Sequence, residues 1–335
     1  MFRNGNQRAS AGGLRILVVR LGAMGDIIHA LPAAATLKHS FPHCRLTWIV
    51  ERKWSYLLSG NPFLDQVIPL DRSLRGVLDA RREMLEFHYD LAVDFQGLIK
   101  SAVIASLSRA DRIFGFHHSQ ARESLAALVY SNRVRAASAH VVDRNLELAA
   151  AAGASNPVHA FPLPAGAAEG ELPAGPFVLA CPLAGWAAKQ WPLEHYGVVA
   201  ERLLGDFGMP LVVNGAPAAE AALRGISGAR VHCSGVAGLV YAMRRAAAVI
   251  GVDSGPLHMA AALKKPGVAL FGPTDPARNG PYSESITVLR DAPAATSYKR
   301  RAEPSPSMKR ITPAAVLEAL RPYLAAATRT AGTTA

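Results

Sequence analysis

Hydrophobic positions in this chain fall into short runs rich in branched residues, separated by longer stretches in which apolar residues recur about every three or four positions. The short runs predict buried parallel strands, and the longer stretches predict the helices that connect them. This alternation is typical of a doubly wound α/β fold. In the first half, the predicted strands are residues 15–20, 45–50, 66–70, 91–95 and 112–116, with helices at 26–39 and 73–86.

A second series of the same kind follows a segment rich in proline and glycine. Residues 153–176 contain five prolines, which favours an irregular connection. Beyond this segment the pattern predicts strands at 177–181, 210–214, 248–252 and 268–271, and helices at 192–205, 237–247, 256–263 and 312–324. Thr312 is the expected N-cap of the last helix. Residues 299–310 are basic and rich in proline and serine, and we expect a loop there.

These patterns divide the chain into two α/β domains. With 335 residues, each domain is large enough to bury its own core. We expect a disordered leader at 1–13, an N-terminal domain at 14–155, a linker at 156–175, a C-terminal domain at 176–311, and a terminal helix and tail at 312–335.

The composition restricts the class of protein. A hydrophobic fraction of 50% and a charged fraction of 18% exclude a disordered chain. The formal net charge of +11 indicates an anionic partner, which could be nucleic acid, a phosphorylated glycolipid or an acidic membrane surface. Three widely spaced cysteines form no disulfide pattern. Arg20 and Asp26 interrupt the first apolar stretch, which excludes a signal peptide or a spanning helix there. We therefore expect a cytoplasmic protein.

The first motif that could carry chemistry is Leu-Gly-Ala-Met-Gly-Asp at residues 21–26, between the first predicted strand and helix. Ligands of α/β sheets bind at the carboxyl ends of strands, and Gly22 and Gly25 permit a tight turn and a close approach. Asp26 has two compatible interpretations. It caps the helix, an interaction that contributes about 1 kcal/mol, or it faces a ligand cleft as a general base. The spacing differs from the G-x-G-x-x-G pattern of dinucleotide-binding domains.

The second motif joins the first strand of the second domain to a helix that Pro192 opens. Lys189 lies at the entrance of this helix, beside unpaired N–H groups, and this combination suits a phosphate group. An ordinary solvated lysine is the alternative. We expect Trp191 to pack in the core and not to bind a ligand.

The third motif is the most specific: Val-Asp-Ser-Gly-Pro-Leu-His at residues 252–258, followed by Phe-Gly-Pro-Thr-Asp-Pro at 271–276. Pro256 suits the first position of a helix. The N–H groups of Ser254 and Gly255 would then point out of the helix start and form an anion-binding nest for a diphosphate.

This motif also has a structural interpretation, in which Asp253 caps the helix and His258 is a partly buried histidine without a role in binding. The sequence provides no three or four zinc ligands at suitable spacing, and it contains neither a nucleophile elbow nor a Walker A loop. We therefore expect no metal and no other cofactor.

Together the three motifs resemble glycosyltransferase family 9, the heptosyltransferases of lipopolysaccharide inner-core synthesis, over residues 15–324 approximately. Segments 94–102 and 120–126 are most similar to the heptosyltransferase I group. The resemblance implies a GT-B fold, in which two Rossmann-like domains face each other across a cleft. It further implies metal-independent, inverting transfer of L-glycero-D-manno-heptose from ADP-heptose, a substrate bound by the C-terminal domain, to the Kdo–lipid A inner core, bound by the N-terminal domain.

The resemblance also implies roles for individual residues. Asp26 matches the family's general base, and Lys189 its phosphate-contacting lysine. The donor-site turn is matched by Asp253, Ser254, Gly255 and His258. The family often places a glutamate for the donor ribose four residues after the glycine that matches Gly215. This chain has Ala219 at that position, so Glu220 is the candidate.

A polyanionic, lipid-linked acceptor would account for the positive net charge. We expect the acceptor to contact Gly25 and six basic residues: Arg72, Arg75, Arg81, Arg82, Lys100 and Arg122. The alternative is that the arginines between 72 and 82 form a solvated helix face. Such an acceptor would place the protein at the cytoplasmic face of the inner membrane, where residues 299–310 could rest on anionic lipid.

Two rival classes remain at this stage. One is a family 9 transferase with another sugar or acceptor, such as a heptosyltransferase II, which a screen of donors and acceptors distinguishes. The other is a non-enzymatic protein that binds nucleotides or nucleic acid, for which basicity is the only support. No basic run interleaved with aromatic residues and no helix-turn-helix pattern occurs, so we expect no nucleic-acid partner.

Overall fold

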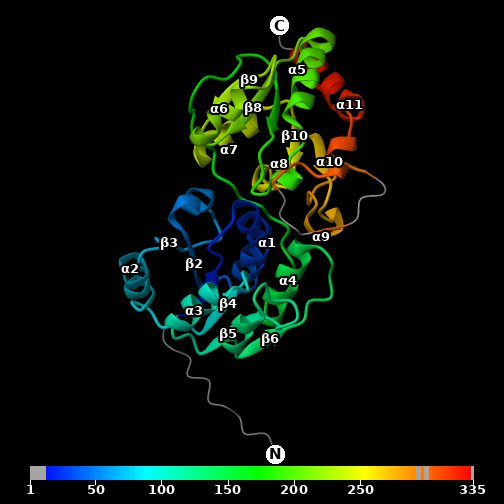
Figure 1. Ribbon diagram of the computed structural model, residues 1–335. Helices are drawn as coiled ribbons and strands as arrows, with labels where there is room; N and C mark the ends of the chain where they lie inside the picture. Colours follow the sequence, from blue (N-terminus) through cyan, green and yellow to red (C-terminus); the bar gives the residue numbers. More distant parts are fainter. Residues whose placement is uncertain (1–12, 292–295, 298–301, 333–335) are drawn as a thin grey trace, which may run out of the picture.

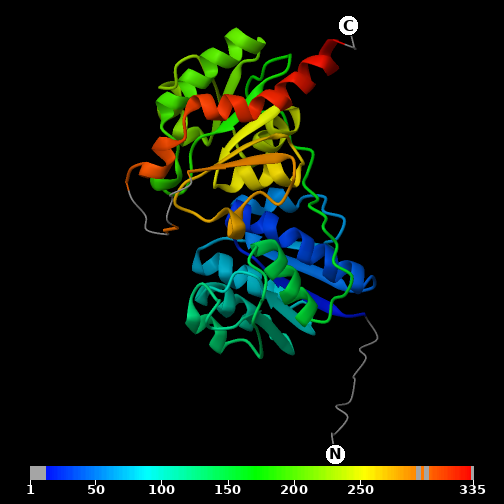
Figure 2. The same cartoon turned by 90° about the vertical axis from the view of Figure 1, so that its right-hand side faces the viewer.

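The computed structural model describes residues 13–291, 296–297 and 302–332, so residues 1–12 of the expected leader lie outside the described residues. Two six-stranded parallel sheets form the centres of an N-terminal and a C-terminal domain, which lie one above the other (Figures 1 and 2). The expected α/β class with two doubly wound sheets is confirmed. The exact limits of the two domains stay a prediction, although no helix or strand occurs in residues 152–177.

The N-terminal sheet has the strand order β3-β2-β1-β4-β5-β6. Its strands are β1 (Arg15–Val19), β2 (Arg45–Glu51), β3 (Gln66–Leu70), β4 (Leu91–Asp94), β5 (Arg112–Phe116) and β6 (Asn132–Val134). Its helices are α1 (Met24–Ser40), α2 (Leu74–Met84), α3 (Ile99–Leu107) and α4 (Val141–Ala151), with 3-10 turns η1 (Arg52–Leu58) and η2 (Ser124–Leu128). The strand β6 and the helices α3 and α4 were not predicted.

The C-terminal sheet repeats this arrangement with the order β12-β11-β10-β7-β8-β9. Its strands are β7 (Val178–Cys181), β8 (Leu211–Gly215), β9 (Arg230–Cys233), β10 (Ala248–Val252), β11 (Gly267–Phe271) and β12 (Ile286–Arg290). Its helices are α5 (Leu193–Phe207), α6 (Glu220–Arg224), α7 (Val236–Arg245), α8 (Gly255–Ala262), α9 (Pro276–Asn279), α10 (Pro306–Arg310) and α11 (Pro313–Gly332), with 3-10 turns η3 (Ala187–Lys189) and η4 (Pro217–Ala219).

Local capping explains two boundaries near the C-terminus. Thr312 accepts a hydrogen bond from the backbone N–H of Ala315 at 3.2 Å, as expected of an N-cap. The prediction of a loop through residue 310 is wrong for its last part, because Ser305 accepts from the N–H of Met308 and opens the short helix α10. Of the same predicted loop, residues 299–301 lie outside the described part of the chain.

The domains meet through the first turns of α1 and α8 (Figure 1). A Cβ atom on Gly25 would lie only 2.5 Å from Cδ2 of His258, and a Cβ on Gly255 only 2.7 Å from Cβ of Met24. The absence of a side chain at both glycines therefore permits this close approach. One hydrophobic cluster runs from α1 and α4 into α7 and α8, so the two domains share a continuous core in this arrangement.

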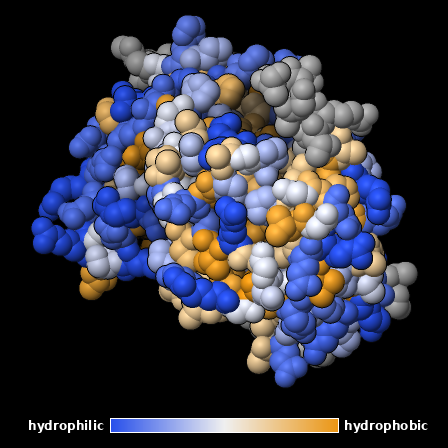
Figure 3. Space-filling view, turned by 90° about the horizontal axis from the view of Figure 1, so that it is seen from above, coloured by the Kyte–Doolittle hydropathy of each residue, from blue (hydrophilic) through white to orange (hydrophobic). Residues whose placement is uncertain are grey.

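Seen from above (Figure 3), hydrophilic side chains cover much of the rim, and hydrophobic side chains gather toward the middle of this face. Val198 and Leu204 on α5 are among the large hydrophobic side chains that are exposed. Such a mixture is ordinary for the surface of a globular protein. Within the described residues, no helix combines the length and apolar character that crossing a membrane requires.

Candidate active site

Both sheets place their motif loops at the point where the strand order reverses. In the N-terminal sheet this point lies between β1 and β4, and in the C-terminal sheet between β7 and β10. Loops that leave two such neighbouring strands diverge to opposite faces of the sheet, which opens a binding crevice at the carboxyl edge. Asp26 follows β1, Lys189 follows β7, and Asp253 follows β10. The topology therefore places these three motif residues where α/β proteins bind ligands.

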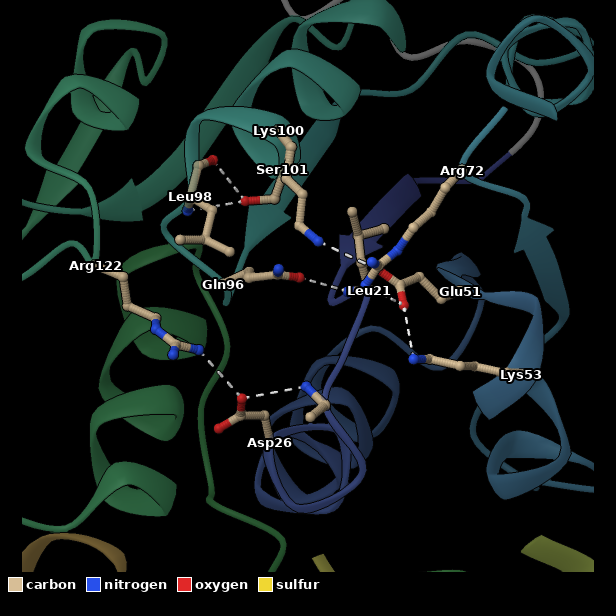
Figure 4. A network of polar contacts seen from close by, with 11 residues as sticks. Leu21, Asp26, Glu51, Lys53, Arg72, Gln96, Leu98, Lys100, Ser101 and Arg122 are labelled. Atoms are coloured by element: carbon tan, nitrogen blue, oxygen red, sulfur yellow. Dashed lines mark hydrogen bonds and ion pairs between the residues drawn. The ribbon is translucent and has the colours of Figure 1, made fainter. Parts of the chain in front are cut away.

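Asp26 lies in the first turn of α1 with its carboxylate among three donors. Its Oδ2 atom is 2.8 Å from Nη2 of Arg20 and 3.2 Å from the backbone N of Ala23. It also lies 3.4 Å from Nη1 of Arg122, which points toward it in Figure 4. The N-cap is Ala23, so Asp26 stabilises the helix start from the third helical position, as one half of a capping box does. The Asp26 side chain is 31% exposed, so the cap leaves it accessible to a substrate.

Arg20 also contacts Asp26, although it was not among the predicted site residues. It is 4% exposed, and its guanidinium donates to the backbone carbonyl of Phe95, just after β4, as well as to Asp26. A buried guanidinium needs partners of this kind. Its position as a charged residue that ends an otherwise apolar strand was the signal that could have identified it.

The basic residues predicted for the acceptor are only partly brought together. Arg122 contacts Asp26. Arg72 and Lys100 both bind Glu51, as does Lys53, and neither Glu51 nor Lys53 had been predicted. The remaining residues predicted for this role lie along α2, where Arg81 is half-buried and two exposed arginines pair with Asp79: Arg75 and Arg82.

On the C-terminal side, Lys189 and Asp253 form a close ion pair. Nζ of Lys189 lies 2.6 Å from Oδ2 of Asp253, and Nε2 of His258 lies 3.6 Å from Oδ1. Asp253 precedes the N-cap of α8, which is Ser254, so the interpretation of Asp253 as the helix cap is wrong. Burial alone would raise the pKa of Asp253, but His258 and Lys189 hold it well below its ordinary value.

Lys189 is not a freely solvated side chain. Its side chain is 16% exposed, and its ammonium lies 4.4 Å from the ring centroid of Trp186. An ammonium group has three donors, and Asp253 accepts from it. Lys189 can therefore donate further hydrogen bonds to a phosphate oxygen. Trp191 is fully buried, as predicted for a core residue.

His258 also contacts the N-terminal domain. It is 6% exposed, and its ring centroid lies 4.1 Å from that of His29 on α1. The ring of His140, which caps α4, lies 5.9 Å from His29, and Nε2 of His140 contacts the carbonyl of Gly280 at 3.1 Å. These three histidines, which we call the interdomain histidines, link elements of both domains.

We expect His29→Phe to make the folded protein less sensitive to mild acid. Burial, followed by the neighbouring His258 and His140, lowers the pKa of His29 well below its ordinary value. In the unfolded chain the pKa is about 6.5, so the folded state binds fewer protons and loses stability as the pH falls through this value. Thermal unfolding between about pH 7.5 and 5.5 measures the loss. The control is His88→Phe, at an exposed histidine. Equal losses in wild type and His29→Phe would contradict the prediction.

The remaining donor-site candidate, Glu220, is the first residue of α6. Its carboxylate pairs with Arg224 at 2.5 Å, and both residues line a surface hollow of about 430 Å³ that Cys233 also borders. In the part of the chain that the structure describes, no group of three or more His, Cys, Asp or Glu side chains is arranged to hold a metal ion.

Comparisons with known proteins agree with this architecture. The model of glycosyltransferase family 9 (heptosyltransferase) matches residues 77–308. Lipopolysaccharide heptosyltransferase 1 of Pseudomonas aeruginosa is 30% identical over an alignment of 315 residues, which covers 86% of this chain and 87% of that protein. The protein of the same name from Escherichia coli K12 is 28% identical over an alignment of 308 residues, which covers 83% of this chain and 93% of that protein.

Two solved structures show the same arrangement of domains. E. coli heptosyltransferase WaaC with ADP has a TM-score of 0.74 at 26% identity and covers 92% of this chain and 100% of its own. E. coli ADP-heptose lps heptosyltransferase II has a TM-score of 0.78 at 25% identity, with coverages of 93% and 99%.

The fold and the position of the motif loops thus define a two-domain glycosyltransferase of the GT-B type. This chain belongs to glycosyltransferase family 9, the heptosyltransferases. The fold class and the family inferred from the three motifs are confirmed.

Proposed function

We propose that this enzyme transfers L-glycero-D-manno-heptose from ADP-heptose to the Kdo–lipid A inner core, which is the heptosyltransferase I step. The observation that carries the proposal is the position of Asp26 and of the Lys189–Asp253 pair. Each follows a strand at the reversal point of its sheet, in two domains that touch through α1 and α8. The similarity to proteins named lipopolysaccharide heptosyltransferase 1 supports the step. A WaaC structure with ADP-2-deoxy-2-fluoro heptose, at 26% identity and a TM-score of 0.72, supports the donor.

In this proposal Asp26 is the general base. The acceptor hydroxyl attacks the anomeric carbon as the bond from that carbon to the diphosphate oxygen breaks, and the hydroxyl proton passes to Asp26. Attack from the face opposite the leaving group inverts the configuration. Arg20 and Arg122 hold the carboxylate in place on one side, while its remaining exposure leaves room for the acceptor. Base catalysis of this kind contributes about 10² to 10⁴ in rate.

The departing ADP is stabilised by groups of the C-terminal domain. Lys189 donates to the diphosphate, and the N–H groups at the start of α8, from Ser254 and Gly255, point toward the same anion. The Asp253 carboxylate and the Trp186 ring keep the ammonium of Lys189 in place. Preorganised donors of this kind can each contribute a few kcal/mol because they need not reorient during the reaction.

We expect transfer to persist in excess EDTA, because these proposed stabilisers of the leaving group are all protein groups. The measurement is heptose transfer before and after chelation, with a metal-dependent glycosyltransferase in parallel to show that the chelator is effective. Activity that disappears with EDTA and returns with Mg²⁺ or Mn²⁺ would contradict the metal-free mechanism.

A screen of donors and acceptors tests the proposed function itself. Calorimetric titration compares ADP-heptose with UDP- and GDP-sugars, and transfer is then measured to Kdo–lipid A and to an acceptor that already carries one heptose. Preference for the second acceptor would assign the chain to the heptosyltransferase II step. A gel-shift assay at several salt concentrations addresses the nucleic-acid alternative, for which we expect no sequence-specific binding.

Because the proposed acceptor is anchored by lipid, we also propose that the enzyme works at the cytoplasmic face of the inner membrane. Its net charge of +11 favours contact with anionic lipid headgroups there. Flotation of the protein with vesicles of anionic or neutral lipids tests this location.

A further inference from the structure

Glu51, the last residue of β2, holds three basic side chains from three separate segments. It is 5% exposed. Arg72, just before α2, donates to both of its oxygens at 2.9 and 3.0 Å, Lys100 of α3 lies 3.2 Å from Oε1, and Lys53 of η1 lies 3.8 Å from Oε2. Figure 4 shows the three side chains converging on this carboxylate. We call Lys53, Arg72 and Lys100 the Glu51 cradle.

The Glu51 cradle has more donors and more positive charge than its carboxylate can satisfy. One negative charge faces three positive charges, and the three basic residues together carry eleven N–H donors by their chemistry. Their side chains are 61%, 71% and 48% exposed for Lys53, Arg72 and Lys100, in contrast to the buried Glu51. Burial would raise the pKa of Glu51, yet hydrogen bonds from Arg72 and Lys100 lower it, so the carboxylate stays charged near neutral pH. The surplus donors face solvent and are available to another anion.

The cradle lies beside the turn that carries the proposed base. A Cβ atom on Gly22 would lie 3.0 Å from Nε1 of Trp54 and 3.9 Å from Oε2 of Glu51. The next residue along the chain, Ala23, donates its N–H to Asp26. Glu51 and Asp26 therefore flank one turn of two residues.

We propose that Glu51 is a positioning residue that assembles Lys53, Arg72 and Lys100 into one oxyanion-binding cradle for an anionic group of the acceptor. This inference rests on the proposed transfer to an anionic saccharide. The anion is a carboxylate or a phosphate of the acceptor, since both present oxygens that a guanidinium and two ammonium groups can bind. Held there, it fixes the saccharide so that the attacking hydroxyl lies at Asp26.

A diffuse electrostatic role of the basic residues and a positioning role of Glu51 predict opposite effects of Glu51→Gln on the KM for the acceptor. This variant gains one unit of positive charge. If the basic residues acted only as a diffuse field, the variant would attract the anionic acceptor more strongly and its KM would fall. If Glu51 holds them in place, the three long side chains lose the negative charge and one of the two acceptor oxygens that order them. The acceptor must then order them itself, which opposes binding. The KM for the acceptor then rises.

The experiment compares steady-state kinetics of wild type, Glu51→Gln, Glu51→Asp and Asp79→Asn. Asp79→Asn is the matched control, because it removes the same charge from an exposed pair with Arg75 and Arg82. We expect Glu51→Gln to raise the acceptor KM about tenfold, with kcat and donor KM close to wild type. Glu51→Asp should recover part of this loss, and Asp79→Asn should leave the acceptor KM unchanged or lower it. An acceptor KM in Glu51→Gln that equals or falls below that of wild type would overturn the proposal.

Two modified acceptors identify the anion. One has its Kdo carboxylate reduced to an alcohol, and the other lacks its phosphates. If one modification removes the difference in acceptor KM between wild type and Glu51→Gln, the group it alters is the one that the cradle binds. A difference in KM that persists with both modified acceptors would overturn the proposal. If wild type transfers no heptose, the proposed function fails by itself. Calorimetry with a deacylated Kdo–glucosamine phosphate saccharide then compares the same variants, and equal affinities would overturn the role of Glu51.

Discussion

Replacement of Asp26 by asparagine is expected to reduce kcat by at least about a hundredfold and to leave donor binding almost unchanged. Asparagine has nearly the same shape but cannot take the proton of the acceptor hydroxyl. Its side-chain oxygen can still accept from the N–H of Ala23, so the start of α1 is retained. Single-turnover kinetics with ADP-heptose and titration with ADP measure the two effects separately.

The surroundings of Asp26 determine the controls. Arg20 is buried and would lose its charged partner, so some loss of thermal stability is expected with the loss of activity. The kinetics should therefore be measured well below the unfolding temperature of the variant. Asp71→Asn is the matched control, because Asp71 pairs with Arg52 on the exposed surface. Turnover near that of wild type in Asp26→Asn would reduce Asp26 to a stabiliser of the helix.

Replacement of Lys189 by alanine is expected to weaken the binding of both ADP and ADP-heptose by at least about tenfold, because its proposed partner is the diphosphate that they share. Isothermal calorimetry of both ligands measures the effect. Lys38→Ala serves as the control, since Lys38 also forms an ion pair, with Asp65, but belongs to the N-terminal domain. Unchanged affinity for ADP in Lys189→Ala would remove this lysine from the donor site.

The same variant has a second consequence that must be separated from the first. It leaves Asp253 buried without the ammonium that balances it, and the loss of one partner from a buried pair costs about 3–5 kcal/mol of stability. The double variant Lys189→Ala/Asp253→Asn removes the uncompensated charge. We expect the double variant to recover thermal stability while its affinity for ADP stays low. Recovery of both would mean that Lys189 acts only through Asp253.

Strand positions were predictable where a strand is buried on both faces. The central strands β1, β7 and β10 read as continuous apolar runs, and their predicted limits agree with the structure to within one residue. The outer strands β6, β9 and β12 were missed, because strands at a sheet edge are short or carry polar side chains. The limits of the α1 helix were off by two residues at its start, where Met24 and Gly25 are helical but looked like part of a loop.

The site was predictable as far as local sequence determines it. A motif after a strand has to lie at the carboxyl edge of a parallel sheet, and this placed Asp26, Lys189 and Asp253 correctly relative to the strands. Contacts between distant segments were not predictable. Glu51 looks like an ordinary charged strand end until Arg72 and Lys100 are brought to it from 21 and 49 residues away.

The arginines in α2 and just before it show the opposite case, in which residues that look alike in the sequence have different surroundings in the structure. In the sequence, Arg72, Arg75 and Arg82 are equivalent members of one basic segment. In the structure Arg72 turns to the buried Glu51, whereas Arg75 and Arg82 pair with Asp79 on an exposed face. Helical spacing alone cannot tell which of them pairs with Glu51.

The meeting of α1 and α8 has an electrostatic consequence. Met24 and Gly255 are the first residues of their helices and lie against each other, so two helix N-termini converge at one point. Each carries a partial positive charge of about one half, whereas the full charges of Arg20 and Lys189 are paired with Asp26 and Asp253. Bringing the two domains together therefore brings two positive helix ends together. An anion between the helix ends would offset this repulsion, so a diphosphate substrate would serve as the counter-ion that holds the enzyme closed around its own reaction.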